Sequence, residues 1–541
     1  SLGVRFAFGV SGGAIAPLWD CLTRSPIRVV HCRHETGAVF AATEASLARD
    51  EPVVVFVTAG PGLSNALTGI HSARTEGARV IVFSGSTAPP LRRRHAFQES
   101  TFQALPVSGL YASGEIVHYA ATPESTGEIY TAIRRIAVGL TRPAGFVAHI
   151  ALPAILQGAP CPRSASRGLL FAAPPAPAPT MIAHCIELLN EGPFVTWIGH
   201  GARGASALVR ALAETTGCPV ICSARAKGVF PEQHPQFVGV SGFGGHDRVQ
   251  QMMRETAPRR ALVLGTRLGE FTSGYVADMV PSHGFIHVDG EVDVPGSAYP
   301  EAPLVAVHAD VAEFLKAVLP GLHPRRDVQL PAATTPETLT PRTTGAVRPA
   351  YLMAAVQRLV VDDSHATVLA DAGNVLAWTT HHLRFAEPGR YRTSTNFSAM
   401  GHAAAGVIGA ALASGHQAVA IVGDGAFLMQ NEISTAVSVQ CPMAWIVLND
   451  ARYNMVGQVL PHLRFDRRHI EIPPVDFAML ARSLGAEGVR VEREYDVDAA
   501  LLAMLAAKRP FVVDVVIDAA QMAPVGARTA ALSGNQPPKA P

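Results

Sequence analysis

The chain has 541 residues, more than one hydrophobic core usually supports, so we expect two to four domains. Its formal net charge is +1 and only 16% of its residues are charged, which excludes the basic surface of a nucleic-acid-binding protein. Hydrophobic residues make up 48% of the chain, but no run reaches the ~18 uninterrupted apolar residues of a membrane span, so no membrane association is predicted.

The first residues and the cysteines bear on the compartment. The chain starts SLGVRF, without a basic region followed by an apolar stretch, so no signal peptide is predicted. The seven cysteines lack zinc-type spacing, and an odd number of them in a large chain favours reduced thiols. We therefore predict a cytoplasmic location.

Two stretches interrupt the alternation of strands and helices. Residues 158–180 are rich in Pro and Ala, and residues 319–349 are rich in Pro, Thr and Arg, as is typical of extended linkers. They leave segments 1–157, 181–318 and 350–520, which alternate apolar strands with amphipathic helices. The pattern predicts an α/β protein of three domains, each a mostly parallel sheet flanked by helices, followed by a mobile tail over 521–541.

The first segment runs strands directly into helix starts. Residues 29–38 (VVHCRHETGA) place Glu35 at such a start, where a carboxylate is commonly a dipole-stabilising surface residue. Residues 8–14 (FGVSGGA) open the segment, residues 58–65 (TAGPGLSN) follow the strand 53–57, and residues 95–99 (HAFQE) come later.

The middle segment contains a formal G-x-G-x-x-G at residues 199–204, after the strand Phe194–Ile198. Dinucleotide binding also requires an acidic residue about 20 positions further on, and residues 218–227 (CPVICSARAK) have none. We therefore interpret this segment as a Rossmann-like domain with a structural role.

The third segment places polar residues after several apolar runs. Gly373-Asn374 follows one run, Gly423-Asp424-Gly425 follows the run 418–422, and Asn449-Asp450 follows the run 444–448. Adjacent parallel strand ends can hold one hard cation, and Mg²⁺ often takes one or two carboxylates together with substrate phosphates. These residues predict a metal and phosphate site.

In this order, the three sets of motifs resemble those of thiamine diphosphate (ThDP) enzymes of the acetolactate synthase and 2-oxo acid decarboxylase superfamily, which includes benzoylformate and pyruvate decarboxylases. The resemblance implies a pyrimidine-binding (PYR) first domain and a diphosphate-binding (PP) third domain. It implies that Glu35 activates the cofactor by hydrogen bonding to the pyrimidine N1′, and that Phe97 and Gln98 line the substrate end. Met400 would support the bent cofactor, with its N–H and the Ser398 carbonyl binding the aminopyrimidine.

The resemblance also implies the metal ligands. They are the carboxylates of Asp424 and Asp450 and the carbonyl of Arg452, with Asn449 as an alternative if the register differs by one. Asp450 stands where relatives carry Asn, and one residue is missing between Phe427 and Glu432. The implied cofactor-binding set is Glu35, Gly373, Asn374, Ser398, Met400, Gly423, Asp424, Gly425, Ala426, Asp450 and Met455.

The middle domain of acetolactate synthases holds a non-redox FAD beside a segment rich in Asp and Arg. This chain keeps only part of that segment, residues 264–271 (LGTRLGEF), so FAD is not expected. Relatives also carry a lysine where residues 111–115 (YASGE) stand, so their substrate preference cannot be transferred.

The leading functional prediction is a ThDP- and Mg²⁺-dependent carboligase that decarboxylates a 2-oxo acid such as pyruvate and transfers the acyl group to a second carbonyl. The alternatives are a simple decarboxylase that releases an aldehyde, a catalytically silent regulatory paralogue and, more remotely, a flavin- or NAD-linked oxidoreductase. Because the family's glutamate meets the diphosphate site of another subunit, the resemblance implies a homodimer or tetramer.

Overall fold

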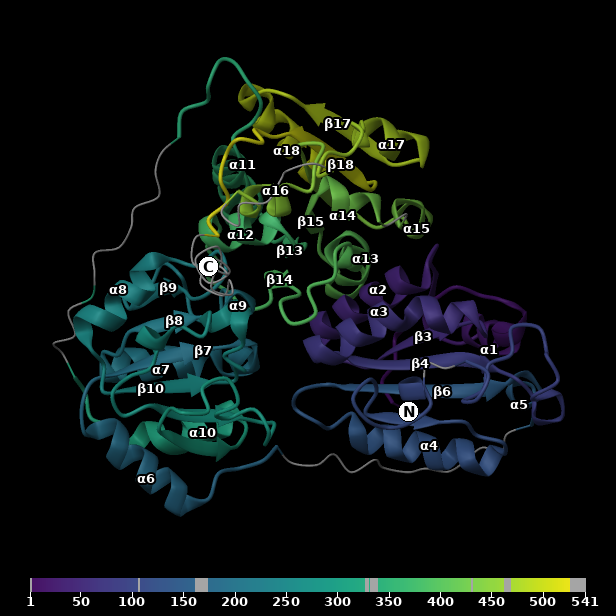
Figure 1. Ribbon diagram of the computed structural model, residues 1–541, viewed down its shortest axis with the longest axis horizontal. Helices are drawn as coiled ribbons and strands as arrows, with labels where there is room; N and C mark the ends of the chain where they lie inside the picture. The colour runs from purple at the N-terminus through teal and green to yellow at the C-terminus, as the bar shows by residue number, and fades with distance from the viewer. Residues whose placement is uncertain are drawn as a thin grey trace, which may run out of the picture.

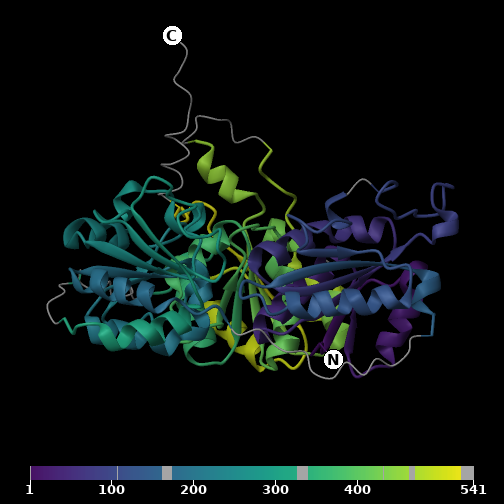
Figure 2. The ribbon, with the colours of Figure 1, turned by 90° about the horizontal axis from the view of Figure 1, so that it is seen from below.

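A computed structural model describes residues 2–105, 108–160, 174–325, 330, 339–429, 432–461 and 469–525. It contains three six-stranded sheets whose paired strands all run parallel. The predicted α/β fold with three domains is therefore confirmed. Figure 1 shows the middle domain beside the first, with the third above both, and Figure 2 shows the same arrangement from below.

The first sheet has the strand order β2-β1-β3-β4-β6-β5. Its central strands are continuous apolar runs because helices cover both faces. Its elements are β1 (Phe6–Gly9), α1 (Ala16–Thr23), β2 (Arg28–His31), α2 (Glu35–Arg49), β3 (Val53–Val57), α3 (Pro61–Glu76), β4 (Arg79–Ser86), β5 (Tyr119–Ala121), α4 (Thr126–Gly139), β6 (Phe146–Pro153) and α5 (Ala154–Gln157).

The middle sheet has the order β12-β11-β10-β7-β8-β9, which is the doubly wound dinucleotide-binding order with its switch point between β7 and β10. Its elements are α6 (Pro179–Asn190), β7 (Phe194–Ile198), α7 (Ser206–Thr216), β8 (Val220–Cys222), β9 (Phe237–Val240), α8 (Asp247–Thr256), β10 (Arg260–Leu264), α9 (Glu270–Ser273), β11 (Phe285–Asp289), β12 (Leu304–His308) and α10 (Val311–Val318).

The third sheet has the order β14-β13-β15-β16-β18-β17. Its elements are α11 (Pro349–Val356), β13 (Thr367–Ala370), α12 (Asn374–His382), β14 (Tyr391–Thr393), α13 (His402–Ser414), β15 (Ala418–Gly423), α14 (Asp424–Leu428), α15 (Ile433–Val439), β16 (Met443–Asn449), α16 (Asn454–Val459), α17 (Phe477–Ser483), β17 (Glu487–Val491), α18 (Val497–Ala506) and β18 (Phe511–Val516).

The register of this third sheet brings the predicted motifs to one edge. Ala370 pairs with Ile421, and Gly423 pairs with Leu448, so β13, β15 and β16 end close together. The polar residues that follow these strands therefore share one rim of the sheet.

Helix α13 packs against α2 of the first domain (Figure 1). Their buried side chains belong to one hydrophobic cluster that continues across the domain boundary, including Ala38, Ala45, Val407 and Ala411. Small residues allow the close approach: a Cβ added to Gly409 would lie 1.8 Å from the Ala41 carbonyl oxygen. The first and third domains are thus joined by a continuous core.

The limits of the predicted domains and linkers stay predictions, because much of both linkers (161–173, 326–329 and 331–338) lies outside the described residues. Of the predicted tail, the Gln521 carbonyl accepts a hydrogen bond from Gln458 Nε2 at 2.8 Å, and Val525 is buried. The packed chain therefore reaches Val525, and residues 526–541 lie outside the described part. No helix in the described ranges is both long and apolar enough to cross a membrane.

Candidate active site

Glu35 is the first residue of α2 and is 7% exposed. The preceding His34 caps the helix by accepting a hydrogen bond from Thr36 N at 3.2 Å. The Asn65 amide nitrogen donates to Glu35 Oε2 at 3.1 Å. A buried carboxylate at the start of a rigid helix is therefore held in a fixed orientation.

The glycines before and within the first turn of α3 leave room at this carboxylate. A Cβ added to Gly62 would lie 3.3 Å from Glu35 Oε1, and one added to Gly60 would lie 3.0 Å from the Gln98 side chain. Ser100 Oγ connects the segments of Gly60 and Gln98. It accepts a hydrogen bond from Gly60 N and donates one to the Gln98 carbonyl at 3.1 Å. The structure therefore brings Gln98 to the same edge as Glu35.

Phe97, which is predicted to line the substrate end together with Gln98, is 92% exposed. Its neighbour Gln98 has φ of 51°, a left-handed backbone that few residues other than Gly adopt. The loop therefore presents the Phe97 ring at the surface of the chain.

Asp424 and Asp450 meet at the ends of β15 and β16. Asp424 Oδ1 accepts from Gly425 N at 2.7 Å, and its Oδ2 accepts from Asp450 N at 3.1 Å. Burial raises the pKa of Asp424, although backbone N–H groups limit the rise. Burial and the nearby Asp424 carboxylate raise the pKa of Asp450 to about 7. Two carboxyl groups are thus held together where a cation would stabilise both.

The neighbours of Asp450 differ in what they offer a metal. The Asn449 amide nitrogen donates to the Asp514 carboxylate and to the Val475 carbonyl, both at 2.9 Å, so Asp450 rather than Asn449 lies next to Asp424. The Arg452 carbonyl already accepts from Asn454 N at 2.9 Å, which leaves its second lone pair for a ligand.

Gly373 and Asn374 form the start of α12. Gly373 has φ of 99°, and a Cβ added to it or to Gly423 would meet nothing within 4 Å, so both glycines face open space. The Asn374 amide nitrogen donates to Gln458 at 3.3 Å, while its buried Oδ1 has no partner among the described residues.

Met400 faces the glycine of the metal segment. A Cβ added to Gly425 would lie 3.5 Å from Met400 Cε and 2.6 Å from the Tyr453 ring. Ser398, two residues before Met400, has φ of 52°. Two further residues are predicted to bind the cofactor. Ala426 is 3% exposed, and Met455 packs against the core of the third domain.

The structure thus forms two groups, one around Glu35 and Gln98 and the other around Asp424, Asp450 and Met400. No hydrogen bond joins Glu35 to Asp424 or Met400 within the described chain. Sequence reasoning missed Tyr453, which covers Gly425, and Asn454, whose amide donates to Asp450 Oδ2 at 2.6 Å. The sequence signal for Tyr453 and Asn454 is their position three and four residues after Asp450.

A cavity of about 410 Å³ lies at the switch point of the middle domain, where residues of the first and third domains, among them Glu76 and Asn396, also line it. Just after β8, near the place where a dinucleotide site carries its acidic residue, Arg225 pairs with Glu76 of the first domain at 3.0 Å. Our expectation that FAD is not bound stays a prediction, which the absence of flavin absorbance in purified protein would support.

Family models match all three domains. The thiamine pyrophosphate enzyme models match residues 1–105 (N-terminal TPP binding domain), 182–318 (central domain) and 371–515 (C-terminal TPP binding domain).

Relatives match over nearly the whole chain. A Mycobacterium tuberculosis protein, provisionally assigned as the acetolactate synthase large subunit IlvB2, is 30% identical over 545 residues and 95% of both chains. The acetolactate synthase isozyme 1 large subunit of Escherichia coli is 26% identical over 98% of this chain and 95% of its own.

Solved structures share the fold. They include a ThDP-dependent 4-hydroxybenzoylformate decarboxylase of Rhodococcus jostii (TM-score 0.83, 21% identity, 96% of this chain and 97% of the other). A benzoylformate decarboxylase of Polynucleobacter necessarius has a TM-score of 0.86 at 17% identity, with the same coverage of both chains. These structures show the shared fold, while the family models and the relatives show that the chain belongs to the thiamine pyrophosphate enzyme family.

Proposed function

We propose that the protein is an acetolactate synthase-like carboligase that decarboxylates a 2-oxo acid of the pyruvate type and transfers the acyl group to a second carbonyl. One observation carries this proposal. The Glu35 carboxylate is buried, held in a fixed orientation, and lies at the same edge of the first domain as Gln98. The relatives named acetolactate synthases favour carboligation over simple decarboxylation.

The residues at the third sheet fit ThDP and a metal ion. Gly373 and Gly423 leave open space, and Asn374 Oδ1 is buried without a partner in the described structure. Asp424 and Asp450 supply two carboxylates, and Mg²⁺ often takes one or two carboxylates beside substrate phosphates. We infer that Asp424, Asp450 and the Arg452 carbonyl bind Mg²⁺.

When bound, ThDP supplies the electron sink that lets carbon dioxide leave a 2-oxo acid. Glu35 would share a proton with the pyrimidine N1′ of the bound cofactor, and its burial shields that carboxyl from bulk water. Met400 would contact the ring system of the bound cofactor. Gln98 orients the substrate carboxylate, and Phe97 packs against the acyl group.

We propose that a second copy of the chain completes the site. Exposed apolar side chains lie near both groups along the chain: Phe97 is 92% exposed, Phe102 53%, Met429 58% and Tyr453 44%. Large apolar side chains gathered at a functional rim are typical of a surface that a partner covers. We propose that the protein forms a homodimer or tetramer. We also propose that it is located in the cytoplasm, which cell fractionation would test.

Product analysis tests the function. Purified protein is incubated with ThDP, Mg²⁺ and pyruvate, with and without a second 2-oxo acid or an aldehyde as acceptor. We expect carbon dioxide release and a coupled hydroxy-ketone product. Release of a free aldehyde instead would establish the decarboxylase, and a panel of 2-oxo acids that yields no carbon dioxide would reject both enzymes and leave the regulatory paralogue.

A further inference from the structure

Residues 394–401 connect β14 to α13 and carry both Ser398 and Met400. The backbone of this segment is unusual, because Ser398 has φ of 52° and Gly401 has φ of 84°. A left-handed conformation is strained for a residue other than Gly, so it persists only where surrounding contacts impose it. The contacts that hold Ser398 therefore determine how Met400 is presented.

Glu76, the last residue of α3 in the first domain, holds the beginning of the segment. Its Oε1 accepts hydrogen bonds from Ser394 Oγ at 2.8 Å, Asn396 N at 3.1 Å and Phe397 N at 3.4 Å. Ser394 Oγ in turn accepts from Ser398 N at 3.0 Å. A continuous chain of hydrogen bonds therefore joins the Glu76 carboxylate to the left-handed Ser398.

A residue of the middle domain fixes the orientation of Glu76. Arg225 Nη1 lies 3.0 Å from Glu76 Oε2, and Arg225 Nη2 donates to the Glu76 carbonyl oxygen at 2.9 Å. Arg225 thus forms an ion pair with Oε2, and the hydrogen bonds from the segment go to Oε1. Glu76 is 2% exposed, so its carboxylate is largely shielded from bulk water. One buried carboxylate thus joins all three domains.

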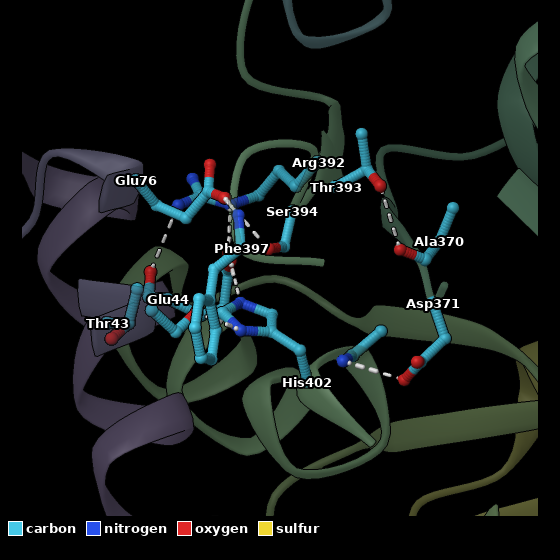
Figure 3. Close-up of polar contacts among 12 residues, drawn as sticks. Thr43, Glu44, Glu76, Ala370, Asp371, Arg392, Thr393, Ser394, Phe397 and His402 are labelled. Atoms are coloured by element: carbon cyan, nitrogen blue, oxygen red, sulfur yellow. Dashed lines mark hydrogen bonds and ion pairs between the residues drawn. The ribbon is translucent and has the colours of Figure 1, made fainter. Parts of the chain in front are cut away.

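The far end of the segment is held from within the third domain. Asp371 Oδ1 accepts from Gly401 N at 2.9 Å, and its Oδ2 accepts from Ala403 N at 2.9 Å and from Ala404 N at 3.2 Å. Figure 3 shows Glu76 approaching the segment from the first domain and Asp371 lying on the opposite side. Ser398 and Met400 lie between these two anchors.

We propose that Glu76 is a positioning residue for the cofactor: through Ser394 it holds Ser398 in the left-handed conformation that presents the Ser398 carbonyl and Met400 to the pyrimidine ring. The inference rests on the proposed ThDP site and adds to it a residue of the first domain that touches neither cofactor nor substrate.

Replacement of Ser394 by Ala tests the proposal, because it deletes the connecting hydroxyl and little volume. The dissociation constant of ThDP is measured by calorimetry with Mg²⁺ and without substrate, and amide hydrogen exchange is followed over residues 394–401. We expect the dissociation constant to rise about five- to tenfold, the loss expected for one hydrogen bond, and exchange in the segment to accelerate. Glu76→Gln should change both readouts in the same direction.

Ser241→Ala is the matched control. Ser241 is 3% exposed and Ser394 is 5% exposed, and the Ser241 hydroxyl also accepts one hydrogen bond, from Trp197, and donates one, to the Cys222 carbonyl. It lies in the middle domain, so this variant should lower the melting temperature as Ser394→Ala does but leave ThDP affinity unchanged.

The outcomes separate the two claims. Equal ThDP affinity in wild type and Ser394→Ala rejects the positioning role and leaves the proposed function intact. A similar loss of affinity in both serine variants also rejects it, since general destabilisation would then explain the effect. A wild-type protein that binds no ThDP rejects the proposed function and the inference together.

Discussion

Asp450 shows how one side chain can change the electrostatics of the proposed metal site. Its carboxyl lies beside Asp424, and burial together with that neighbour raises the pKa of Asp450 to about 7. A second carboxylate adds negative charge where a diphosphate is expected, so the metal ion must offset more repulsion than an Asn ligand would require.

Replacing Asp450 by Asn should therefore make ThDP binding less dependent on Mg²⁺ concentration. We also expect the metal-free variant to be more stable than the wild type by about 1 kcal/mol, because a buried like-charge contact is removed. Calorimetric titration of ThDP at a series of Mg²⁺ concentrations, with thermal melts of the apoprotein, measures both effects. An identical Mg²⁺ dependence in the two proteins would contradict the assigned role.

Glu35→Gln should lower kcat by about 10²–10⁴, the usual contribution of one positioned acid–base group. The amide keeps the size of the side chain and can still contact Asn65, so ThDP binding and the melting temperature should change little. Steady-state kinetics and a thermal melt provide the measurements. Full activity in this variant would rule out the proposed mechanism.

At the scale of elements, the crossing of α2 and α13 joins the Glu35 helix to the Met400 segment. Glu44 of α2 pairs with Arg392, and it accepts a hydrogen bond from His402 Nε2 at 2.8 Å. Ser72 of α3 contacts the other nitrogen of the same imidazole at 2.9 Å. Glu44 and His402 are visible at the boundary in Figure 3. The two helices are thus held by polar contacts inside an apolar interface.

This pairing gives the interface a dependence on pH. Burial favours the protonated carboxyl, but Arg392 and His402 outweigh it and lower the pKa of Glu44 from 4.5 to about 2. A folded-state pKa below the unfolded value means that the stabilisation is complete above about pH 4.5 and is lost as the pH falls through about 2.

We expect Glu44 to contribute roughly 3 kcal/mol of unfolding free energy that disappears over this window. Urea unfolding at several pH values should give a steeper decline for the wild type than for Glu44→Gln. Parallel pH profiles for the two proteins would show that the pairing does not stabilise the fold.

The close helix crossing can be tested at Gly409. A Cβ there would lie 1.8 Å from the Ala41 carbonyl oxygen, so Gly409→Ala should lower the unfolding free energy by about 1–3 kcal/mol or more. Gly127→Ala in α4 is the control, because the nearest atom to its added Cβ is 3.9 Å away. This control should be neutral or stabilise the protein by about 0.5–1 kcal/mol. Equal melting temperatures for the two variants would disprove the steric argument.

At the scale of the whole molecule, we propose that the two groups of site residues belong to different copies. A mixture of two inactive variants, Glu35→Gln and Asp424→Asn, tests this directly. In a mixed dimer, one site combines both substitutions and the other has neither, so random reassembly should restore about a quarter of wild-type activity. Co-refolding followed by an activity assay is the measurement. A mixture that stays inactive, although mixed dimers form, would place both groups in one copy.

The sequence by itself determined the fold class and the rim of the third sheet. Parallel strands buried on both faces read as continuous apolar runs, and turn residues with a carboxylate mark their ends, so Asp424 and Asp450 could be placed from local pattern alone. Only the structure shows how Asn449 is oriented, that Tyr453 covers Gly425 and that Phe97 is exposed. The sequence does not predict these features, because the direction of a side chain in a loop depends on tertiary packing.

Only the tertiary structure decided which residues support the site from a distance. Glu76 lies 318 positions before Ser394, and Glu44 lies 358 positions before His402. In the sequence, each is an ordinary acidic residue in an amphipathic helix. They become buried because the domains share one core at these positions. A carboxylate enclosed in that core requires hydrogen-bond donors, and the opposite domain supplies them.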